Sequence, residues 1–468
     1  ERWYKRATIV EWQPLPQVVQ KPSDTTSVTL ASAIWQYRAM RTLSPHSLAL
    51  SSPQAASRFE PLPTVKPGLA FAVFDEYIVM AESATVLEAY IDTLPEEGSL
   101  MENAQFQRTM QRPQYEQSFM VGHGNLGQLL SMINTANQRL VASLPSASSP
   151  LLVPQLPPEA LAQLKTTTDS IDAYLWAQRD GIQLRYLVQM DRPIAGLPAI
   201  TPTNHANKLL NRLPASSYLS LNSADLKSIW RLVLATMETQ PALAQSLGEL
   251  RRVGLQELGL DDHDVFSWMD GEFALCLFPS RKGFLGSTIG MALVVQTSER
   301  SAAEAALRKF DAYAQSLQIY SVKPRRLQGQ WATSWDAVYA NESLLAHGWL
   351  DQSTLLITNG TGPMAEIMPK PAMNLASASE FQSAVAPLPK ENTGYSYINV
   401  KAASNLMFNY VLPQVAPPEV LSAPEMLAMR KALAGIRSIS ATVSHQANRS
   451  QVDFFLALRP ALPPKRQR

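Results

Sequence analysis

Four neighbouring residues, Asp261, Asp262, His263 and Asp264, place three carboxylates and one imidazole in a single short stretch. Such groups bind metal ions and serve in general acid–base catalysis. Successive side chains on a helix or a strand diverge, so these neighbours need distant partners to converge on one ion. We therefore interpret the stretch as a solvent-facing polar turn after the helix QELGL, in which Asp264 caps the segment VFSWM.

The only cysteine, Cys276, lies in the apolar run ALCLF. A nucleophilic thiol needs partial exposure and a neighbouring positive charge or histidine, and the interior of an apolar strand offers neither. We predict a buried and inert thiol. A single cysteine also rules out an internal disulfide framework and any zinc or iron–sulfur site built from several cysteines.

The other histidines are scattered singly along the chain, at His46, His123, His205, His347 and His445. No HExxH motif, GxSxG motif or phosphate loop accompanies them. His123 follows a strand as Asn222 and Asn399 do elsewhere, where an asparagine caps the next helix, so we interpret His123 as a cap or turn residue. We assign no catalytic, cofactor-binding or metal-ligating residue and expect no cofactor, although the many carboxylates leave an unmarked Asp/Glu pair open.

The elements that must position these residues alternate between strands and helices. EFALCLF is apolar on both faces, which predicts a fully buried strand, and GMALVVQT and SYLSLN predict further strands. TSERSAAEAALRKFDAYAQSL predicts a helix, either with a capping box at Ser301 and Glu304 or with an earlier start, at Thr297 or Ser298. Its apolar stripe consists of Ala306, Phe310, Tyr313, Ala314 and Leu317.

Hairpins dominate the predicted strand connections, with turns at Asp180-Gly181 and at Asp351-Gln352. We therefore predict an α+β fold: a duplicated module of mostly antiparallel sheets, with helices packed on one face.

The duplication rests on matches that keep their order and spacing. The matched pairs are Asp75 with Asp351, Phe106 with Phe381, Phe119 with Tyr395, and Pro158 with Pro424. The first three pairs are 275 or 276 positions apart and the last pair is 266 apart, as a longer loop in the first copy would produce. A repeat of this length indicates two copies of one structural module.

The predicted organisation is a first module at 1–192, a linker at 193–205, a second and complete module at 206–460, and a basic tail at 461–468. The first module lacks counterparts of the early strands and carries an insertion at about 13–66. We expect the absent elements upstream of Glu1. Without them, the first module has an open sheet edge, or one covered by the insertion's helix through Ile34, Trp35 and Tyr37.

The composition limits the classes of partner that the protein can bind. Charged residues make up 17% of the chain and the net charge is +1, so no large basic face exists for a phosphate backbone and we expect no nucleic-acid partner. No apolar run approaches the roughly 18 residues that a membrane span needs.

The succession LPASSYLSLNSADL, LDDHDVFSWMDGEFAL, SERSAAEAALRKF and EFQSAVAPLPKENTGYSYINV resembles a cyanobacterial family that carries a large domain of unknown function, DUF3352. The resemblance covers nearly the whole chain, and its most specific piece is the acidic turn followed by the tryptophan and the apolar strand. It implies a membrane-anchored protein that faces the periplasm or thylakoid lumen, with the anchor upstream of this chain. It supplies no catalytic residues.

We expect a non-enzymatic extracytoplasmic protein that binds or scaffolds another protein at the membrane and assists the assembly or upkeep of a membrane complex. Two alternatives stay open: a hydrolase-type enzyme with a carboxylate site between the modules, and a carrier of a small hydrophobic ligand. If the protein is an enzyme, we expect convergent polar groups in a pocket. If it is a carrier, we expect a closed apolar cavity, and if it is a scaffold, a broad exposed apolar patch.

Overall fold

The chain divides into two compact units, residues 1–108 with 146–150, and residues 109–145 with 151–468. These units are groups of contacts, whereas the predicted modules are groups of similar sequence, so the module bounds stay a prediction. A computed structural model describes residues 2–4, 7–12, 69–74, 78–81, 83–93, 100–125, 127, 129, 168–190, 207–224, 226–238, 241–281, 288–339, 342–415, 418–446 and 448–459.

The first unit contains a four-stranded antiparallel sheet in the order β1-β2-β3-β4. Its strands are β1 (Arg2–Tyr4), β2 (Ala7–Trp12), β3 (Leu69–Val73) and β4 (Ile78–Ala81). The helix α2 (Ala84–Thr93) packs on one face, where Leu87 and Ile91 join the small residues Ala70 and Ala72 and the strand residue Ile9 in a buried cluster. The turn η1 (Leu100–Glu102) and the helix α3 (Ala104–Met110) follow.

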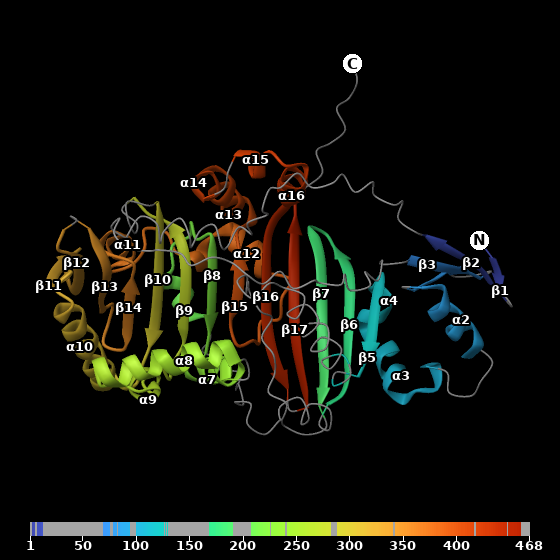
Figure 1. Cartoon of the computed structure of the whole chain (residues 1–468), viewed down its shortest axis with the longest axis horizontal. Coiled ribbons are helices and arrows are strands. Elements are labelled where there is room, and N and C mark those ends of the chain that lie inside the picture. The colour runs from blue at the N-terminus through green and yellow to red at the C-terminus, as the bar shows by residue number, and fades with distance from the viewer. Residues whose placement is uncertain are drawn as a thin grey trace, which may run out of the picture. The chain divides into compact units, whose positions relative to one another are not determined.

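The second unit is built on one 13-stranded sheet, in the order β11-β12-β13-β14-β10-β9-β8-β15-β16-β17-β7-β6-β5 (Figure 1). All of its strand pairs are antiparallel. The strands are β5 (Met120–Gly124), β6 (Thr168–Gln178), β7 (Gly181–Met190), β8 (Leu219–Ser223), β9 (Phe273–Pro279), β10 (Ile289–Gln296), β11 (Tyr320–Leu327), β12 (Gln330–Ala337), β13 (Ser343–Trp349), β14 (Thr354–Thr358), β15 (Tyr395–Ile398), β16 (Ile436–Gln446) and β17 (Arg449–Leu458).

Helices and short turns connect these strands. They are α4 (Pro113–Gln117), η2 (Lys208–Arg212), α7 (Leu226–Glu238), α8 (Pro241–Val253), the π-helix η3 (Gly254–Leu258), α9 (Asp262–Phe266), α10 (Arg300–Ser316), α11 (Thr361–Ile367), η5 (Leu375–Ser377), α12 (Ser379–Val385), α13 (Val400–Leu406), the π-helix η6 (Met407–Val411), α14 (Leu412–Val415), α15 (Pro418–Leu421) and α16 (Pro424–Ala434). The α+β class and the antiparallel sheets are confirmed. In the part of the chain that the structure describes, no helix is long and apolar enough to cross a membrane.

Helices cover both faces of the central strands, whereas the sequence analysis predicted one covered face. Alternate residues of β9 separate the two layers: Ala274, Cys276 and Phe278 pack with α11 and α12, and Phe273 packs with Trp268 and α10. The double cover explains why EFALCLF is apolar on both sides, because a strand buried on two faces needs apolar residues at every position.

The predicted helix after β10 is present as α10, and Ala306 and Ala314 of its apolar stripe are buried. The predicted capping box at Ser301 and Glu304 is absent. The helix begins after Glu299, which makes no side-chain cap, and the Glu304 carboxylate instead accepts a hydrogen bond from the Arg300 guanidinium at 2.8 Å.

Strand pairing repeats between the two copies. The order β11-β12-β13-β14 repeats β1-β2-β3-β4, and β15-β16-β17 repeats β5-β6-β7. Met120 faces Leu175 across β5 and β6, and Ser396 faces Ala441 across β15 and β16. The first members of these pairs are 276 positions apart and the second members 266 apart, the offsets seen in the sequence.

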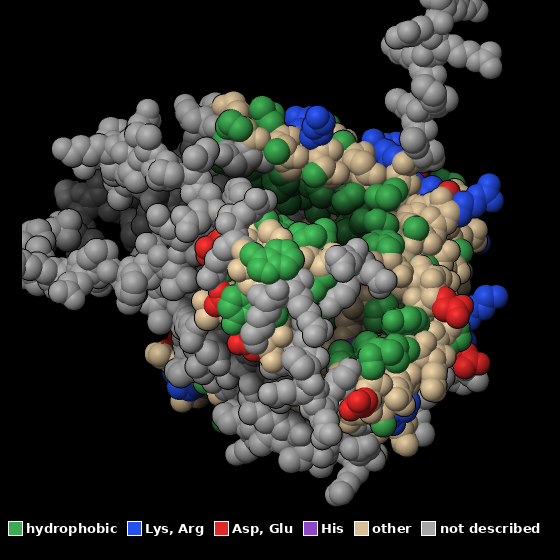
Figure 2. Space-filling model, turned by 90° about the vertical axis from the view of Figure 1, so that its right-hand side faces the viewer, with side chains coloured by type: hydrophobic (Ala, Val, Ile, Leu, Met, Phe, Trp, Pro, Cys, Tyr) green, Lys and Arg blue, Asp and Glu red, His purple; other side chains and the backbone are tan. Residues whose placement is uncertain are grey.

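The two copies differ in what lies beyond their fourth strand, β4 in the first copy and β14 in the second. Among the described residues no strand pairs with the outer edge of β4, whereas β10 pairs with the equivalent strand β14. Ile78 and Met80 on β4 are 67% and 63% exposed, and Figure 2 shows hydrophobic side chains reaching the surface beside charged ones. The expected open edge is therefore present among the described strands. Ile34, Trp35 and Tyr37 of the insertion lie outside the described residues.

Candidate functional site

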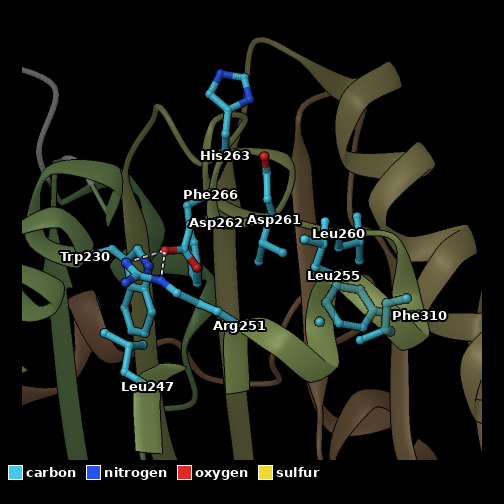
Figure 3. A pocket seen from close by; sticks show the side chains of 13 residues that line it. Trp230, Leu247, Arg251, Leu255, Leu260, Asp261, Asp262, His263, Phe266 and Phe310 are labelled. Atoms are coloured by element: carbon cyan, nitrogen blue, oxygen red, sulfur yellow. Dashed lines mark hydrogen bonds and ion pairs between the residues drawn. The ribbon is translucent and has the colours of Figure 1, made fainter. Parts of the chain in front are cut away.

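A pocket of about 500 Å³ opens to solvent between α7, α8, η3, α9 and α10 (Figure 3). Most of its lining is apolar, from Trp230, Leu247, Leu255, Leu258, Leu260, Val265, Phe266 and Phe310. The indole of Trp230 stacks on the ring of Phe266 with the ring centroids 4.3 Å apart. Leu247 and Leu260 are buried in the wall, while Leu255 at the rim is 62% exposed.

The local sequence explains how α8 and η3 come to line this pocket. Leu247, Leu255 and Leu258 fall on one side of a helix by their spacing, and the π-helical turn at Gly254–Leu258 carries that side past the end of α8. The apolar face therefore continues beyond the end of α8, and part of it reaches solvent.

The charged groups beside the pocket are paired with each other. The Arg251 guanidinium donates to the Asp262 carboxylate at 2.6 Å and to the Glu238 carboxylate at 2.7 Å. These hydrogen bonds raise the pKa of Arg251 above its ordinary value, with Asp262 the larger cause. Figure 3 shows this pair among the lining side chains, with His263 pointing away from them. A pocket with an apolar interior, beside which the Arg251 guanidinium is already paired with two carboxylates, is suited to an apolar group rather than to an anionic substrate.

The acidic stretch forms the start of α9, and its cap is Asp261 rather than the predicted Asp264. Oδ1 of Asp261 accepts from the Asp264 amide at 2.8 Å, and Oδ2 of Asp264 accepts from the Asp261 amide at 3.4 Å. The two residues therefore form a capping box, which satisfies two amides at once. A cap at Asp261 lets α9 begin one turn earlier than the segment VFSWM.

Three of the four groups come closer together than the sequence suggested. Ligand atoms of Asp261, His263 and Asp264 lie within 4.8 Å of one another, and all three residues are exposed. Both carboxylates already accept amide hydrogen bonds, and the Lys309 ammonium lies 3.8 Å from Asp264 and repels a cation. The polar-turn interpretation agrees with this geometry, and the expectation that no metal binds here stays a prediction.

Cys276 is fully buried in β9, as predicted, and burial raises the pKa of its thiol to about 12. Because the reactive species is the thiolate, we expect no reaction of the native protein with the thiol reagent 5,5′-dithiobis(2-nitrobenzoate) at pH 8. One equivalent should react once denaturant unfolds the chain. Rapid labelling of the native protein would contradict the buried position.

His123 does not cap a helix, which corrects the sequence interpretation. Its Nδ1 atom lies 2.8 Å from Oδ1 of Asp172, the residue opposite it on β6, and 3.0 Å from the Thr109 hydroxyl. In the second copy Ser438 takes the place of Asp172, and Asn399 caps α13 through the Ala402 amide at 3.0 Å. The buried aspartate thus engages the His123 ring across the two strands, where the second copy has only the small Ser438.

This cluster does not have the geometry of a hydrolytic triad. The aspartate and the hydroxyl meet the same ring nitrogen, whereas a triad places them on opposite nitrogens of the histidine. The Thr109 hydroxyl also donates to Asp172 at 2.7 Å, and the Arg112 guanidinium lies 3.6 Å from the same carboxylate. These contacts hold the buried Asp172 carboxylate in place and do not activate a nucleophile.

Two further single histidines lie in strands. His347 on β13 contacts Asp311 at 2.9 Å through Nε2, and His445 on β16 contacts the Ser450 hydroxyl at 2.9 Å through Nδ1. Burial lowers the pKa of His445, so this imidazole favours the neutral form. His46 and His205 lie outside the described residues.

A buried carboxylate that the sequence analysis did not single out is Glu272, which directly precedes β9. It accepts hydrogen bonds from the backbone amides of Asn207, Lys208 and Leu209, at 2.8, 3.0 and 3.1 Å. Burial is the largest influence on this group and raises its pKa. Glu272 therefore anchors the start of η2 to the sheet.

The sequence analysis also missed the pocket residues. Leu247, Leu255 and Leu258 have helical spacing, which could have indicated an apolar face, but nothing in the sequence says that Trp230 and Phe310 lie opposite that face. The predicted carboxylate, imidazole and thiol groups are not brought together into one site. Asp261 and His263 border the pocket, and Cys276 and His123 belong to other parts of the sheet.

Comparison with known proteins places the chain in a family. A family model described as "Protein of unknown function (DUF3352)" matches residues 48–458. No curated protein matches the chain significantly. The structure titled "Structure of crystal form III of TP0453" is similar over 55% of this chain and 82% of its own, with 8% sequence identity and a TM-score of 0.26, which is too low to support an argument about fold or function. The chain belongs to the DUF3352 family.

Proposed function

We propose that this protein is a non-enzymatic binding protein that receives an apolar segment of another protein in the pocket between α7 and α10. The observation that carries the proposal is an open pocket with a mostly apolar lining, beside which the Arg251 guanidinium is already paired with Asp262 and Glu238. An amphipathic helix laid into such a groove buries its apolar side and leaves its polar side in water.

The same observation argues for a protein segment over a small hydrophobic ligand. A carrier encloses most of its ligand surface, whereas this pocket is open and its rim residue Leu255 is 62% exposed. A protein segment can cover that rim as well as fill the pocket, because it extends beyond the part that inserts. Arg251 and Asp262 can then border the covered area as polar rim residues.

The setting of this binding is a further part of the proposal. We propose that it takes place at a cyanobacterial membrane, in the periplasm or the thylakoid lumen, where the protein assists the assembly or upkeep of a membrane complex. The support for the membrane setting is the family resemblance of the sequence, and the pocket supports the binding role alone.

The binding role can be tested with the dye 1-anilinonaphthalene-8-sulfonate, which fluoresces in apolar sites. We expect the folded chain to bind the dye, and an amphipathic leucine–lysine peptide of about four helical turns to displace it. A peptide of the same composition with scrambled order should displace little dye. Displacement by oleate but by neither peptide would instead support a carrier, and failure to bind dye would contradict an accessible apolar pocket.

Replacing Leu255 by lysine is expected to weaken peptide binding by about 10- to 100-fold, the equivalent of losing one buried leucine side chain. Leu255 is largely exposed, so the variant should keep the melting temperature of the parent protein. The matched control is Met373→Lys, because Met373 is 73% exposed and lies outside the pocket. Equal losses in both variants would place peptide binding elsewhere.

A further inference from the structure

A second pocket, of about 410 Å³, lies on the sheet face between α10 and the strands β11, β12 and β13. Its lining differs in kind from that of the first pocket, because it combines tryptophans with charged and hydroxyl groups. Trp331 and Trp349 come from the sheet with Thr333 and His347, and Glu304, Arg308 and Asp311 come from α10.

The floor of this pocket contains an open aromatic surface. Trp331 is 68% exposed. Trp349 follows Gly348, the strand partner of Ala332, and therefore stands beside Trp331 on the neighbouring strand. The Arg300 guanidinium lies 4.2 Å from the centre of the Trp349 ring and covers it. The ring of Trp331 is thus the aromatic surface that remains open to a ligand.

A fixed hydrogen-bonding group stands beside the tryptophans. Oδ1 of Asp311 lies 2.9 Å from Nε2 of His347 and accepts from the Trp335 indole at 2.7 Å. The carboxylate at Nε2 orients the ring, and Nδ1 is the second ring nitrogen that can form a hydrogen bond. His347 is buried, which keeps its ring in one orientation.

The charges of the pocket balance. Glu304 is paired with Arg300 at 2.8 Å, and Asp311 is engaged by the histidine and the indole. Arg308 has no hydrogen-bonding or ionic partner among the described residues and can donate to a ligand. With two carboxylates and two guanidinium groups around it, the pocket has no excess charge to attract an anion or a cation.

We propose that this pocket binds a neutral saccharide. A sugar ring has a C–H face that packs on an indole and hydroxyl groups at its edge that both donate and accept hydrogen bonds. Trp331 supplies the flat surface, Arg308 supplies donors, the Thr333 hydroxyl both donates and accepts, and Nδ1 of His347 supplies a further hydrogen-bonding atom. Each group that a neutral polyhydroxylated ring requires is present on one side of α10.

The test is calorimetric titration of the full chain with three series of neutral oligosaccharides: cello-, malto- and N-acetylated chito-oligosaccharides. We expect saturable binding of at least one of them and at least a tenfold loss of affinity in Trp331→Ala. The matched control is Trp3→Ala, which removes a tryptophan that is 71% exposed on the other sheet and should bind as the parent protein does.

Two results would overturn the saccharide assignment: no saturable binding of any of the three series, or equal losses in Trp331→Ala and Trp3→Ala. Circular dichroism of each variant separates loss of binding from loss of fold. The second variant Arg308→Gln keeps the aromatic surface and removes the charge, and we expect it to weaken binding by a smaller factor than Trp331→Ala. The result does not depend on the apolar pocket, because the two pockets share no lining residue.

Discussion

Replacing Leu355 by lysine is expected to destabilise the protein by more than about 4 kcal/mol, because it puts an unpaired charge into a closed core. Leu355 on β14 is fully buried and packs with Val295 of β10 and Ala303 of α10. The lysine has no partner there and displaces apolar contacts on both elements. Urea unfolding followed by circular dichroism should show a lost or strongly shifted main transition.

Ile78 is the matched position in the first copy, because it faces Val73 as Leu355 faces Trp349. We expect Ile78→Lys to change the free energy of unfolding by no more than about 0.5 kcal/mol, as for an exposed site. The contrast tests the open edge at β4 directly. A large destabilisation by Ile78→Lys would mean that another polypeptide segment covers this face as β10 and α10 cover β14.

Replacing Glu272 by alanine is expected to lower the free energy of unfolding by about 2–4 kcal/mol, because buried amides without an acceptor cost about 1–3 kcal/mol each. The amides of Asn207, Lys208 and Leu209 lose their acceptor together. We expect less than the summed cost of three unpaired amides, because removing the carboxylate also removes the free-energy cost of burying it. Glu391→Ala, at an exposed glutamate, is the control and should be nearly neutral.

The same carboxylate gives the stability a dependence on pH. Its pKa in the folded protein is raised by burial, so the folded state binds the proton more tightly than the unfolded chain does. This stabilising contribution is fully present at pH values below the pKa of Glu272 in the unfolded chain. It is lost as the pH rises through the pKa of Glu272 in the folded protein. The stability of the parent protein relative to Glu272→Gln should therefore fall over that interval. An unchanged difference would mean that the carboxylate is not buried in solution.

Much of the fold follows from local patterns. The run EFALCLF predicts β9. Asp180-Gly181 predicts the hairpin between β6 and β7, where the turn residues are Arg179 and Asp180, and Asp351-Gln352 predicts the turn between β13 and β14. These succeed because a strand apolar on every residue and a two-residue turn are decided by the sequence nearby. The offsets of 276 and 266 positions carry the register of β5 and β6 onto β15 and β16.

Two of the failures have a cause in contacts between distant residues, and the third is local. His123 was taken for a cap because its neighbours resemble those of Asn399, but Asp172 stands opposite it, 49 positions away in the chain. The pocket brings together residues from Trp230 to Phe310 that lie on four helices and a π-helical turn, and no local pattern sets how those elements face one another. The cap of α9 was missed by one turn because several acidic residues compete for that position.

The central claim, that an apolar segment of another protein occupies the pocket between α7 and α10, is tested most directly by photo-crosslinking in the cells that make the protein. A benzoylphenylalanine at Leu255 should form an adduct with a protein, and mass spectrometry should map that adduct to an amphipathic segment. The same photoreactive residue at Met373 should not form it. Adducts that are the same at both positions, or that contain lipid alone, or their absence at Leu255, would contradict the proposed binding role.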